Sequence, residues 1–327
     1  MPRSSTDPGE RPDRPRAAHD DAVVHPANAI TLFRTTAADP AVGRRLQRGH
    51  RDGSFVRVRH GVYVERAAWD ALDEASRYLV LVRAAVPDLP VGAVLSHDSA
   101  AIHRVPRIDP WPLRVHAVVP GSDEEVYRVG LTLHGGAVTP DGRRFHGVDF
   151  ASLVDTVVER ARRADLVGAV IAFDDALRRG VTVDELLDAL ARAPRWGTAR
   201  AAEALEVCDG AHESVGESFL AARFHELGVV GLVAQQEFAR QDGGVDRVDF
   251  WLPGPRLVVE FDGRQKYEDA SMTGGRSGAD VVWAEKVRED RVRARPEVRG
   301  FVRVTWWHLV VPDRLRALLR THGLRCR

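Results

Sequence analysis

Alternating hydrophobic and polar positions predict a β-hairpin in the last third of the chain. Residues Val245–Leu252 and 257–262 are two strand-like runs, and between them lies the sequence Pro253-Gly254-Pro255-Arg256. Proline fixes φ and glycine tolerates positive φ, so this stretch is typical of a turn. We therefore expect a hairpin in which Leu252 pairs with Leu257.

This pairing gives the predicted hairpin one acidic and one apolar face. It places Asp249 opposite Glu260 and Arg247 opposite Asp262, because side chains alternate between the faces of a strand. A slip of one residue would bury the acids, so the register is well determined. The opposite face must pack on a core, and it consists of Val248, Phe250, Leu252, Leu257, Val259 and Phe261.

The acidic face needs a compensating cation. Two carboxylates directly opposite on a sheet lie about 5 Å apart and repel one another. Arg247 can neutralise Asp262, but the pair Asp249 and Glu260 still needs a proton or a divalent metal ion. We favour the metal ion, so the sequence predicts a carboxylate metal site on this hairpin.

The helix before the hairpin carries a further candidate acid. Ser214 opens an amphipathic stretch that Gly228 ends, and Glu217 lies three residues after Ser214. Glu217 can close a capping box with Ser214, or it can be a catalytic acid beside the hairpin. The sequence leaves both alternatives open.

Cationic residues follow the hairpin. Lys266 lies in the turn directly after it, and residues 268–280 are rich in glycine and serine, as in a mobile loop. A basic helix is expected over 282–295. A strand over 300–307 and a short helix over 312–319 complete the predicted unit.

A second hairpin is predicted near the N-terminus. Phe55–Arg59 and residues 62–64 are strand-like, and His60-Gly61 forms the turn between them. Helical pieces precede the hairpin from residue 29 onward. A helix followed by a two-stranded ribbon is typical of a winged helix-turn-helix.

This N-terminal unit is basic although the whole chain is neutral. The 327 residues include 47 Lys and Arg and 47 Asp and Glu. Between residues 44 and 59, six arginines and one acid, Asp52, leave a local charge of +5. Such a cluster is either a solvated surface or a phosphate-binding face. The candidate DNA contacts are Arg44, Arg45, Arg48, Arg57 and Arg59.

The region between the two hairpins shows strands followed by helices. Its helices are expected to be amphipathic, with apolar residues recurring every three to four positions. The last of them leads to a domain boundary near residue 211. The expected elements are a helix over 69–85, a strand over 113–119 and helices over 152–163, 165–179 and 198–207, with Thr182 and Glu185 as the capping box of one more helix.

Neither histidines nor cysteines show a metal-binding spacing. Cys208 and Cys326 are the two cysteines, and neither belongs to a CxxC motif. No two histidines of the middle region have ligand spacing either, so no chemistry is assigned to them. These histidines are His97, His103, His116, His134 and His146.

Length and composition indicate several domains of a soluble, cytoplasmic protein. At about 100 to 200 residues per domain, the chain is long enough for two or three. The first 27 residues are rich in Pro, Arg and Asp and lack the apolar core of a signal peptide. No run approaches the roughly 18 apolar residues of a membrane span. We expect a disordered tail over 1–27.

The C-terminal motifs resemble very-short-patch-repair endonucleases of the PD-(D/E)XK nuclease superfamily. The resemblance rests on the ordered segments ESVGESFLAARFHELG, RVDFWLPGPRLVVEFDGRQKY and EKVREDRVRARPEVRGFVRVTWWHL. It implies a restriction-endonuclease-like mixed sheet flanked by helices. One departure is that Asp262 stands where the superfamily's second motif has a lysine.

This resemblance also implies an activity, the Mg²⁺- or Mn²⁺-dependent hydrolysis of DNA phosphodiesters. Asp249 and Glu260 would hold the metal ion with help from Glu217, and Lys266 would stabilise the developing charge. Asp262 would be a further ligand or a partner for Arg247. The basic helix would position the phosphate backbone, through Lys286 and Arg291.

The N-terminal half resembles the AbiEi family of type IV toxin–antitoxin antitoxins. The segments that carry this likeness are GRRLQRGHRDGSFVRVRHGVYV, VLSHDSAAIHRVP and DFASLVDTVVERARRADLVGAVIAFDDALRRG. It implies a winged-helix DNA-binding domain joined to a second α/β domain. A cognate toxin is an implied partner, and the nuclease-like domain could then be an inactive scaffold of a transcriptional regulator.

The sequence thus predicts a multidomain α/β (α+β) protein without a membrane partner. Two functions remain open, a metal-dependent endonuclease and a DNA-binding regulator. The expected division is a tail over 1–27, a winged helix-turn-helix over 28–66, an α/β domain over 67–210 and a nuclease-like domain over 211–327.

Overall fold

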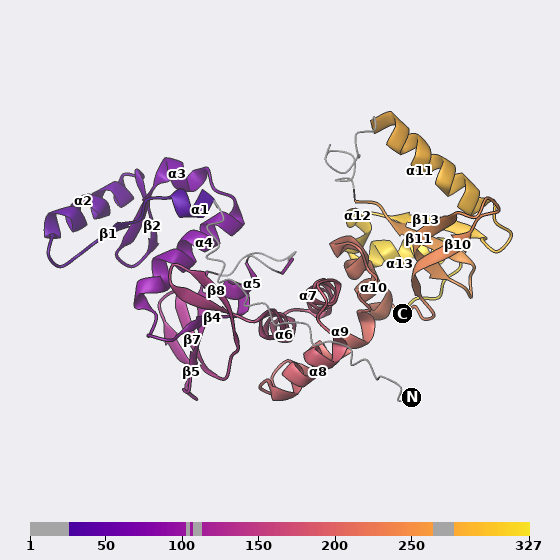
Figure 1. Ribbon diagram of the computed structural model, residues 1–327. Coiled ribbons are helices and arrows are strands. Elements are labelled where there is room, and N and C mark those ends of the chain that lie inside the picture. Colours follow the sequence, from indigo (N-terminus) through magenta and orange to yellow (C-terminus); the bar gives the residue numbers. More distant parts are fainter. Residues whose placement is uncertain (1–25, 103–104, 107–112, 264–277) are drawn as a thin grey trace, which may run out of the picture.

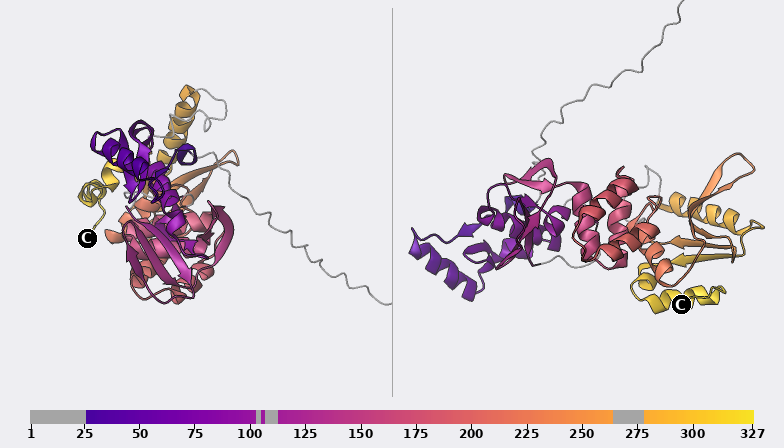
Figure 2. Two further views of the ribbon diagram at one scale, coloured as in Figure 1. Left: turned by 90° about the vertical axis from the view of Figure 1, so that its left-hand side faces the viewer. Right: turned by 90° about the horizontal axis from the view of Figure 1, so that it is seen from below.

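The computed structural model describes residues 26–102, 105–106, 113–263 and 278–327 (Figure 1). Within these ranges the chain forms helices and three β-sheets, so the expectation of a mixed α/β protein is confirmed. Two of the sheets lie toward one end of the molecule and the third at the other end, with a group of helices between them (Figures 1 and 2). No helix in the described ranges is long and apolar enough to cross a membrane. The predicted tail lies almost wholly outside the described residues.

The N-terminal unit is a small three-stranded sheet with a helix beside it. The strand order is β1-β3-β2, and the β2–β3 hairpin is the predicted ribbon. Gly61 has a φ of +72° in the hairpin turn, where an added Cβ would meet Thr35 Oγ1 at 2.8 Å. Asp39 caps α2 by accepting hydrogen bonds from two backbone N–H groups. The elements are α1 Pro26–Ala29, β1 Phe33–Arg34, α2 Pro40–Arg51, β2 Phe55–Arg59, β3 Val62–Glu65 and α3 Arg66–Asp70.

The second sheet has six strands in the order β6-β7-β5-β4-β9-β8. It shares one buried core with the N-terminal unit, since Val64 of β3 packs in the same cluster as Leu95 and Val115. The single helix expected over 69–85 is instead two, because Asp73 accepts from Ser76 N and starts a new helix. The elements are α4 Glu74–Ala85, η1 Val86–Asp88, β4 Val94–Leu95, α5 His97–Ala101, β5 Val115–Pro120, β6 Val126–Arg128, β7 Leu131–Gly136, β8 Pro140–Phe145 and β9 Val148–Ala151.

Four helices, α6 to α9, connect this sheet to the C-terminal unit. Ser152 and Asp165 cap α6 and α7, and Thr182 and Glu185 form the predicted capping box of α8. Gly197 precedes α9 with a φ of +75°, and an added Cβ would meet Arg162 O at 2.1 Å. The helices are α6 Leu153–Arg163, α7 Leu166–Arg178, α8 Val183–Arg192 and α9 Thr198–Val207, close to the predicted ranges.

The C-terminal unit contains a four-stranded mixed sheet in the order β10-β11-β12-β13. The pair β12–β13 is parallel and the others are antiparallel. Helix α11 covers one face, where Val292 packs with Trp251 and Phe301, and the opposite face packs on α10 and α13. The elements are α10 Val215–Glu226, β10 Val233–Ala239, β11 Val245–Leu252, β12 Leu257–Phe261, α11 Gly278–Arg293, β13 Gly300–Val304, α12 Trp306–Leu309 and α13 Pro312–Thr321.

Three expectations for this unit need correction. The strand expected over 300–307 ends at Val304, because the backbone N–H of Thr305 donates to His308 Nδ1 and a short helix begins. Strand β10 was not predicted, and Phe238 is its one fully buried residue. The basic helix begins at Gly278, inside the range expected to be a loop, and most of that loop range lies outside the described residues.

One core runs across the expected boundary near residue 211. Phe173 of α7 belongs to the same buried cluster as Leu220 of α10 and Phe250 of β11. At the junction, Asp174 accepts hydrogen bonds from the backbone N–H groups of Asp209 and Gly210 and pairs with His212, with Oδ2 and Nδ1 2.7 Å apart. This buried acid therefore ties α7 to the segment that leads into α10.

Stability at neutral pH should depend on His212. Burial alone lowers the pKa of His212, but the hydrogen bond and charge of Asp174 outweigh burial and raise that pKa above the ordinary 6.5. The stabilising contribution is then fully present below pH 6.5 and is lost as pH rises through the raised pKa. We expect His212→Asn to lower the free energy of unfolding by about 1–3 kcal/mol at about pH 6, with a smaller loss at about pH 9.

Urea unfolding at the two pH values measures this difference, and His322→Gln, at an exposed histidine after α13, is the control. An equal loss in His212→Asn at both pH values would contradict the expected role of the charged imidazole.

Candidate nucleic-acid interface

Helix α2 packs closely on the β2–β3 ribbon and leaves its arginines exposed. Leu46 and Gly49 are the buried positions of the helix. An added Cβ on Gly49 would lie 2.6 Å from a ring carbon of Phe55, so the glycine permits this close approach. The remaining faces of the helix are therefore free to present Arg44, Arg45, Arg48 and Arg51 to solvent.

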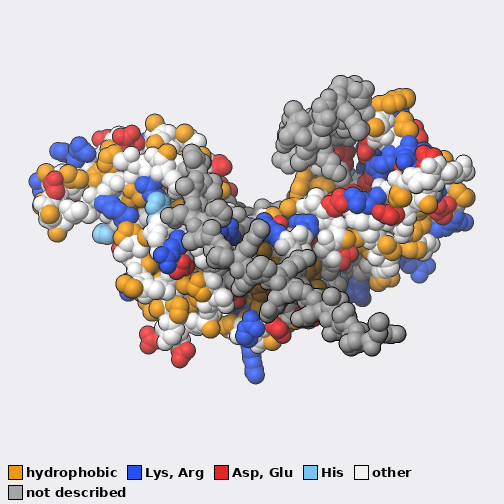
Figure 3. Space-filling model, in the orientation of Figure 1, with side chains coloured by type: hydrophobic (Ala, Val, Ile, Leu, Met, Phe, Trp, Pro, Cys, Tyr) orange, Lys and Arg blue, Asp and Glu red, His pale blue; other side chains and the backbone are white. Residues whose placement is uncertain are grey.

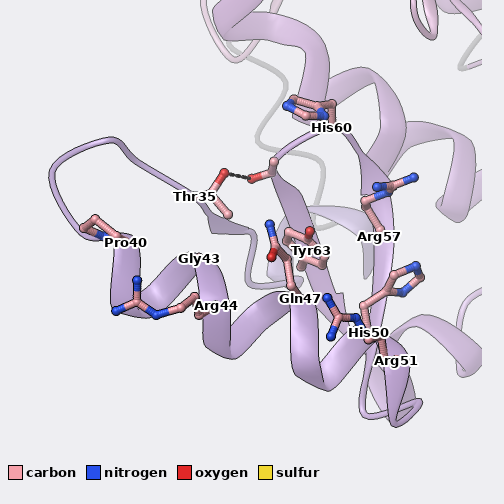
Figure 4. Close-up of a pocket in the computed structure, with 11 residues that line it drawn as sticks. Thr35, Pro40, Gly43, Arg44, Gln47, His50, Arg51, Arg57, His60 and Tyr63 are labelled. Carbon is pink, nitrogen blue, oxygen red and sulfur yellow. Dashed lines mark hydrogen bonds between the residues drawn. The ribbon is translucent and has the colours of Figure 1, made fainter.

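A groove of about 510 Å³ lies between α2 and the ribbon (Figure 4). Three arginines and two histidines line it, and none of its described lining residues is acidic. The Arg and His side chains of this end of the molecule are visible in Figure 3. Because cationic side chains attract anions, the groove fits a phosphate-bearing ligand. The cations and polar residues are Arg44, Gln47, His50 and Arg51 from α2, and Arg57, His60 and Tyr63 from the ribbon.

The predicted DNA contacts fall into three groups. Arg44 and Arg57 line the groove, while Arg45 and Arg48 are exposed on α2 outside it. Arg59 does not belong to this surface, because its Nη2 lies 2.8 Å from Asp88 Oδ2 of η1 and its side chain is only 11% exposed. This partner lies 29 positions farther along the chain, so no local pattern indicated it.

Several groove residues were not predicted as contacts. Gln47, His50 and Arg51 lie on the same helix as Arg44, and His60 lies in the hairpin turn. Arg44, Gln47 and Arg51 recur at intervals of three and four, which is the spacing of one helical face. This spacing could have indicated from the sequence that Gln47 and Arg51 share a face of the helix with Arg44.

The C-terminal hairpin has the predicted register at its turn. Leu252 pairs with Leu257, and Phe250 pairs with Val259. Beyond this point the ladder stops, and Asp249 Oδ2 accepts a hydrogen bond of 2.8 Å from the backbone N–H of Phe261. Val248 packs in the cluster beneath α11 instead of beside Phe250 as expected.

An arginine neutralises Glu260 of the hairpin. Glu260 is buried, and its Oε1 accepts from Arg288 Nη1 of α11 at 2.7 Å. Arg288 also donates to Glu285 and to the backbone carbonyl of Arg247. Burial alone would lower the pKa of Arg288, but the hydrogen bonds to Glu260 and Glu285 raise it. Arg288 is therefore charged and holds Glu260 as an ion pair.

The expected pair of Arg247 and Asp262 is wrong. Arg247 Nη2 lies 2.6 Å from Glu213 Oε1, and Asp262 Oδ2 lies 3.7 Å from Arg303 Nη1. Positions 247 and 262 lie beyond the end of the β11–β12 ladder, so they do not face each other. Arg303 lies on β13, the parallel neighbour of β12, at the register position opposite Glu260.

Glu217 has a structural role in the described geometry. The side chain accepts hydrogen bonds from Ser214 Oγ at 2.7 Å, Glu213 N at 2.9 Å and Gln235 Nε2 at 2.7 Å. Ser214 Oγ in turn accepts from the backbone N–H of Glu217. Ser214 thus caps α10 as the capping alternative expects, but Glu217 reaches back to the backbone N–H of Glu213 and not to that of Ser214.

The remaining candidates of the nuclease-like unit are Lys286, Arg291 and Lys266. Lys286 is exposed on α11, and Lys266 lies outside the described residues. Arg291 Nη2 lies 2.6 Å from Asp246 Oδ1, and this hydrogen bond lowers the pKa of Asp246. Arg291 is thus committed to a buried acid of the sheet.

A divalent metal ion does not fit the hairpin acids as they are arranged. In the described part of the chain, Glu217, Asp249, Glu260 and Asp262 provide no group of three ligand atoms within 4.8 Å of one another. Mg²⁺ requires several oxygen ligands in octahedral geometry, whereas Glu260 here binds an arginine. We therefore derive no hydrolytic step from these residues.

Two other groups of side chains could hold a metal ion, and neither was predicted. One is Asp174, Asp209 and His212 at the junction before α10, and the other is His97, His116 and His134 in the middle region. Each group joins residues from separate segments, so no local spacing in the sequence reveals it.

Comparisons with known proteins assign no family to the chain. No family model and no curated protein matches it. Among solved structures, the Rv2827c protein from Mycobacterium tuberculosis is similar with a TM-score of 0.32 and 16% identity, over 61% of this chain and 77% of that one.

The ion pair of Glu260 and Arg288 should stabilise the C-terminal unit. Replacing Arg288 by Met leaves a buried carboxylate without its main partner, so we expect the free energy of unfolding to fall by about 1–3 kcal/mol. Urea unfolding measures this loss. Lys286→Met, at an exposed position of the same helix, should change stability by less than about 0.5 kcal/mol. Equal effects in the two variants would show that the pair does not stabilise the fold.

Proposed function

We propose that this protein binds double-stranded DNA through α2 and the β2–β3 ribbon. The supporting observation is the cationic groove between them, whose described lining includes three arginines, two histidines and no acid. In the C-terminal unit, by contrast, Glu260, Asp262 and Asp246 each have an arginine partner. The N-terminal unit is therefore the better candidate for binding an anionic polymer.

The extent of the cationic surface favours a polymer over a small anion. Helix α2 has 12 residues and is thus about 18 Å long. Arg45 and Arg48 are exposed on this helix outside the groove, so they extend the cationic surface around it. Several phosphates in a row can contact such a surface, and each contact releases counterions.

A role in regulation is consistent with binding alone. The resemblance of the N-terminal half to AbiEi antitoxins implies a transcriptional regulator with a toxin partner. The groove supports the DNA-binding part of that role. The proposal of a toxin partner rests on the resemblance alone. In this proposal the nuclease-like unit is a scaffold.

Removing groove arginines should weaken DNA binding in a salt-dependent manner. We expect the triple variant Arg44→Ala, Arg51→Ala, Arg57→Ala to bind a short duplex more weakly and to reduce the slope of log K against log salt by about 0.9 per lost contact. Fluorescence anisotropy between about 50 and about 200 mM salt measures both quantities.

The matched control is Arg66→Ala, an exposed arginine of α3 paired with Asp70. It should leave affinity and slope unchanged. If the triple variant also keeps the affinity and slope of the wild type, the groove is not the DNA-binding surface.

The alternative that the sequence left open is metal-dependent DNA cleavage by the C-terminal unit, and the binding of Glu260 by Arg288 disfavours it. The observation in its favour is that Asp249 reaches the backbone of Phe261, so it lies beside Glu260 on the neighbouring strand. Because Arg288 binds Glu260, we expect purified protein with Mg²⁺ or Mn²⁺ to leave plasmid and mismatched duplex DNA intact while still binding them. Gel electrophoresis of the DNA reports cleavage.

Cleavage that is lost in both Asp249→Ala and Glu260→Ala would instead establish the nuclease. Cleavage that persists in both variants points to a contaminating enzyme, and DNA binding by the groove is judged separately by the anisotropy experiment.

A further inference from the structure

Three histidines from separate segments meet beside a pocket in the middle region. His97 is the first residue of α5, His116 lies on β5 and His134 on β7. Strands β5 and β7 are parallel, with His116 opposite Thr132 and Val118 opposite His134. The two strand histidines are thus diagonal neighbours on one face of the sheet. One ligand atom from each of the three imidazoles lies within 4.8 Å of the others, and the side chains are buried.

Hydrogen bonds define the roles of the ring nitrogens. Glu125 Oε1 lies 2.9 Å from His134 Nδ1, and His134 Nε2 lies 2.9 Å from His116 Nδ1. An ionised carboxylate only accepts, so His134 Nδ1 carries a proton. In the neutral imidazole His134 Nε2 then has a lone pair, which accepts from His116. The lone pair of His134 is directed toward the other histidines.

A second carboxylate orients His97. Glu159 Oε2 lies 3.1 Å from His97 Nε2, and His97 Nδ1 lies 2.9 Å from Ser96 Oγ. Arg162 Nη1 holds both oxygens of Glu159 at 2.7 Å. Carboxylates that hydrogen-bond one nitrogen of a histidine fix the ring so that the other nitrogen can bind a metal. Two of the three histidines have such a partner.

The backbone at His97 is strained. Its φ is +52°, in the left-handed region that a residue with a Cβ rarely adopts. Such strain is concentrated at functional sites. The surrounding structure has to hold His97 in this conformation, and the imidazole contacts with Glu159 and Ser96 contribute to that.

The cluster is open to a pocket of about 630 Å³. His97 and His134 line this pocket together with their carboxylate partners Glu125 and Glu159, and Trp196 forms another part of the wall. A ligand or water molecule in the pocket can therefore approach His97 and His134.

We propose that His97, His116 and His134 form a binding site for a divalent transition-metal ion of the zinc class. Imidazole nitrogen suits Zn²⁺, and three histidines with an open fourth position are a known ligand set for it. Glu125 and Glu159 are second-sphere partners, and the pocket supplies the open position. This site is independent of the proposed DNA-binding groove.

Metal binding requires a rearrangement of the rings. The proton between His116 Nδ1 and His134 Nε2 has to move to His116 Nε2, because the metal takes its place between the two nitrogens. The His97 and His134 rings now stack with centroids 4.0 Å apart, and they must tilt so that both lone pairs point at one ion. A change of the His116 tautomer, with no net loss of a proton from the neutral rings, is thus a feature of the proposal.

Zinc titration of the full chain tests this site. The protein, with any affinity tag removed, is stripped with a chelator and titrated with Zn²⁺ in a calorimeter, and Co²⁺ absorption reports the coordination geometry. We expect one bound ion in the wild type and its loss in His116→Ala and His134→Asn. Glu125→Gln and Glu159→Gln should weaken binding about 10- to 100-fold.

Two controls separate this site from other histidines. His146→Ala, at an exposed position of the same region, and His212→Asn, in the other candidate group, should each keep one bound ion. A thermal melt checks that every variant is folded. No bound zinc in the wild type, or a zinc ion that is lost in His212→Asn but kept in folded His134→Asn, would overturn the proposal.

Discussion

Burial of helix α7 is the constraint on which the arrangement of the middle and C-terminal units depends. Its residues from Leu166 to Ala176 are all buried, so the helix is covered on every side by other elements. Helix α6, which carries Glu159 and Arg162, packs against one side of α7, and α10 packs against another. Hydrophobic burial of this kind supplies most of the free energy that holds elements together. The histidine pocket and the mixed sheet are therefore positioned by one shared core.

Charge is distributed unevenly over this framework. The C-terminal unit contains many arginines, but Arg288, Arg291 and Arg303 each bind acids of the sheet or of α11. The groove of the N-terminal unit has no such acids among its described lining residues. The net charge of zero thus hides a cationic N-terminal unit, whose charge is balanced by acids elsewhere in the chain. For DNA binding the local distribution matters more than the total, because screening limits charge interactions to about 10 Å.

Features set by local rules could be predicted from the sequence. The register of the β11–β12 hairpin beside its turn followed from alternation and a Pro-Gly-Pro turn, and the capping box of α8 followed from Thr182 and Glu185. Strand β10 was not predicted because Phe238 is its one buried residue, so the strand shows no alternating apolar pattern. Helix α12 was not predicted because the apolar run of the strand continues through Trp306. In the structure the helix is capped by Thr305.

The site residues were harder to predict because their partners are distant in the sequence. Arg59 and Asp88, or Glu260 and Arg288, become neighbours only when whole elements pack, and either arginine alone looks like a free cation. The same holds for His116 and His134, which the parallel pairing of β5 with β7 brings together. From the sequence alone, the acids lack a visible cationic partner, so a metal ion is expected there. The histidines show no ligand spacing, so no metal ion is expected near them. Long-range packing thus gives Glu260 an arginine partner and brings three imidazoles together, and no sequence spacing indicates either arrangement.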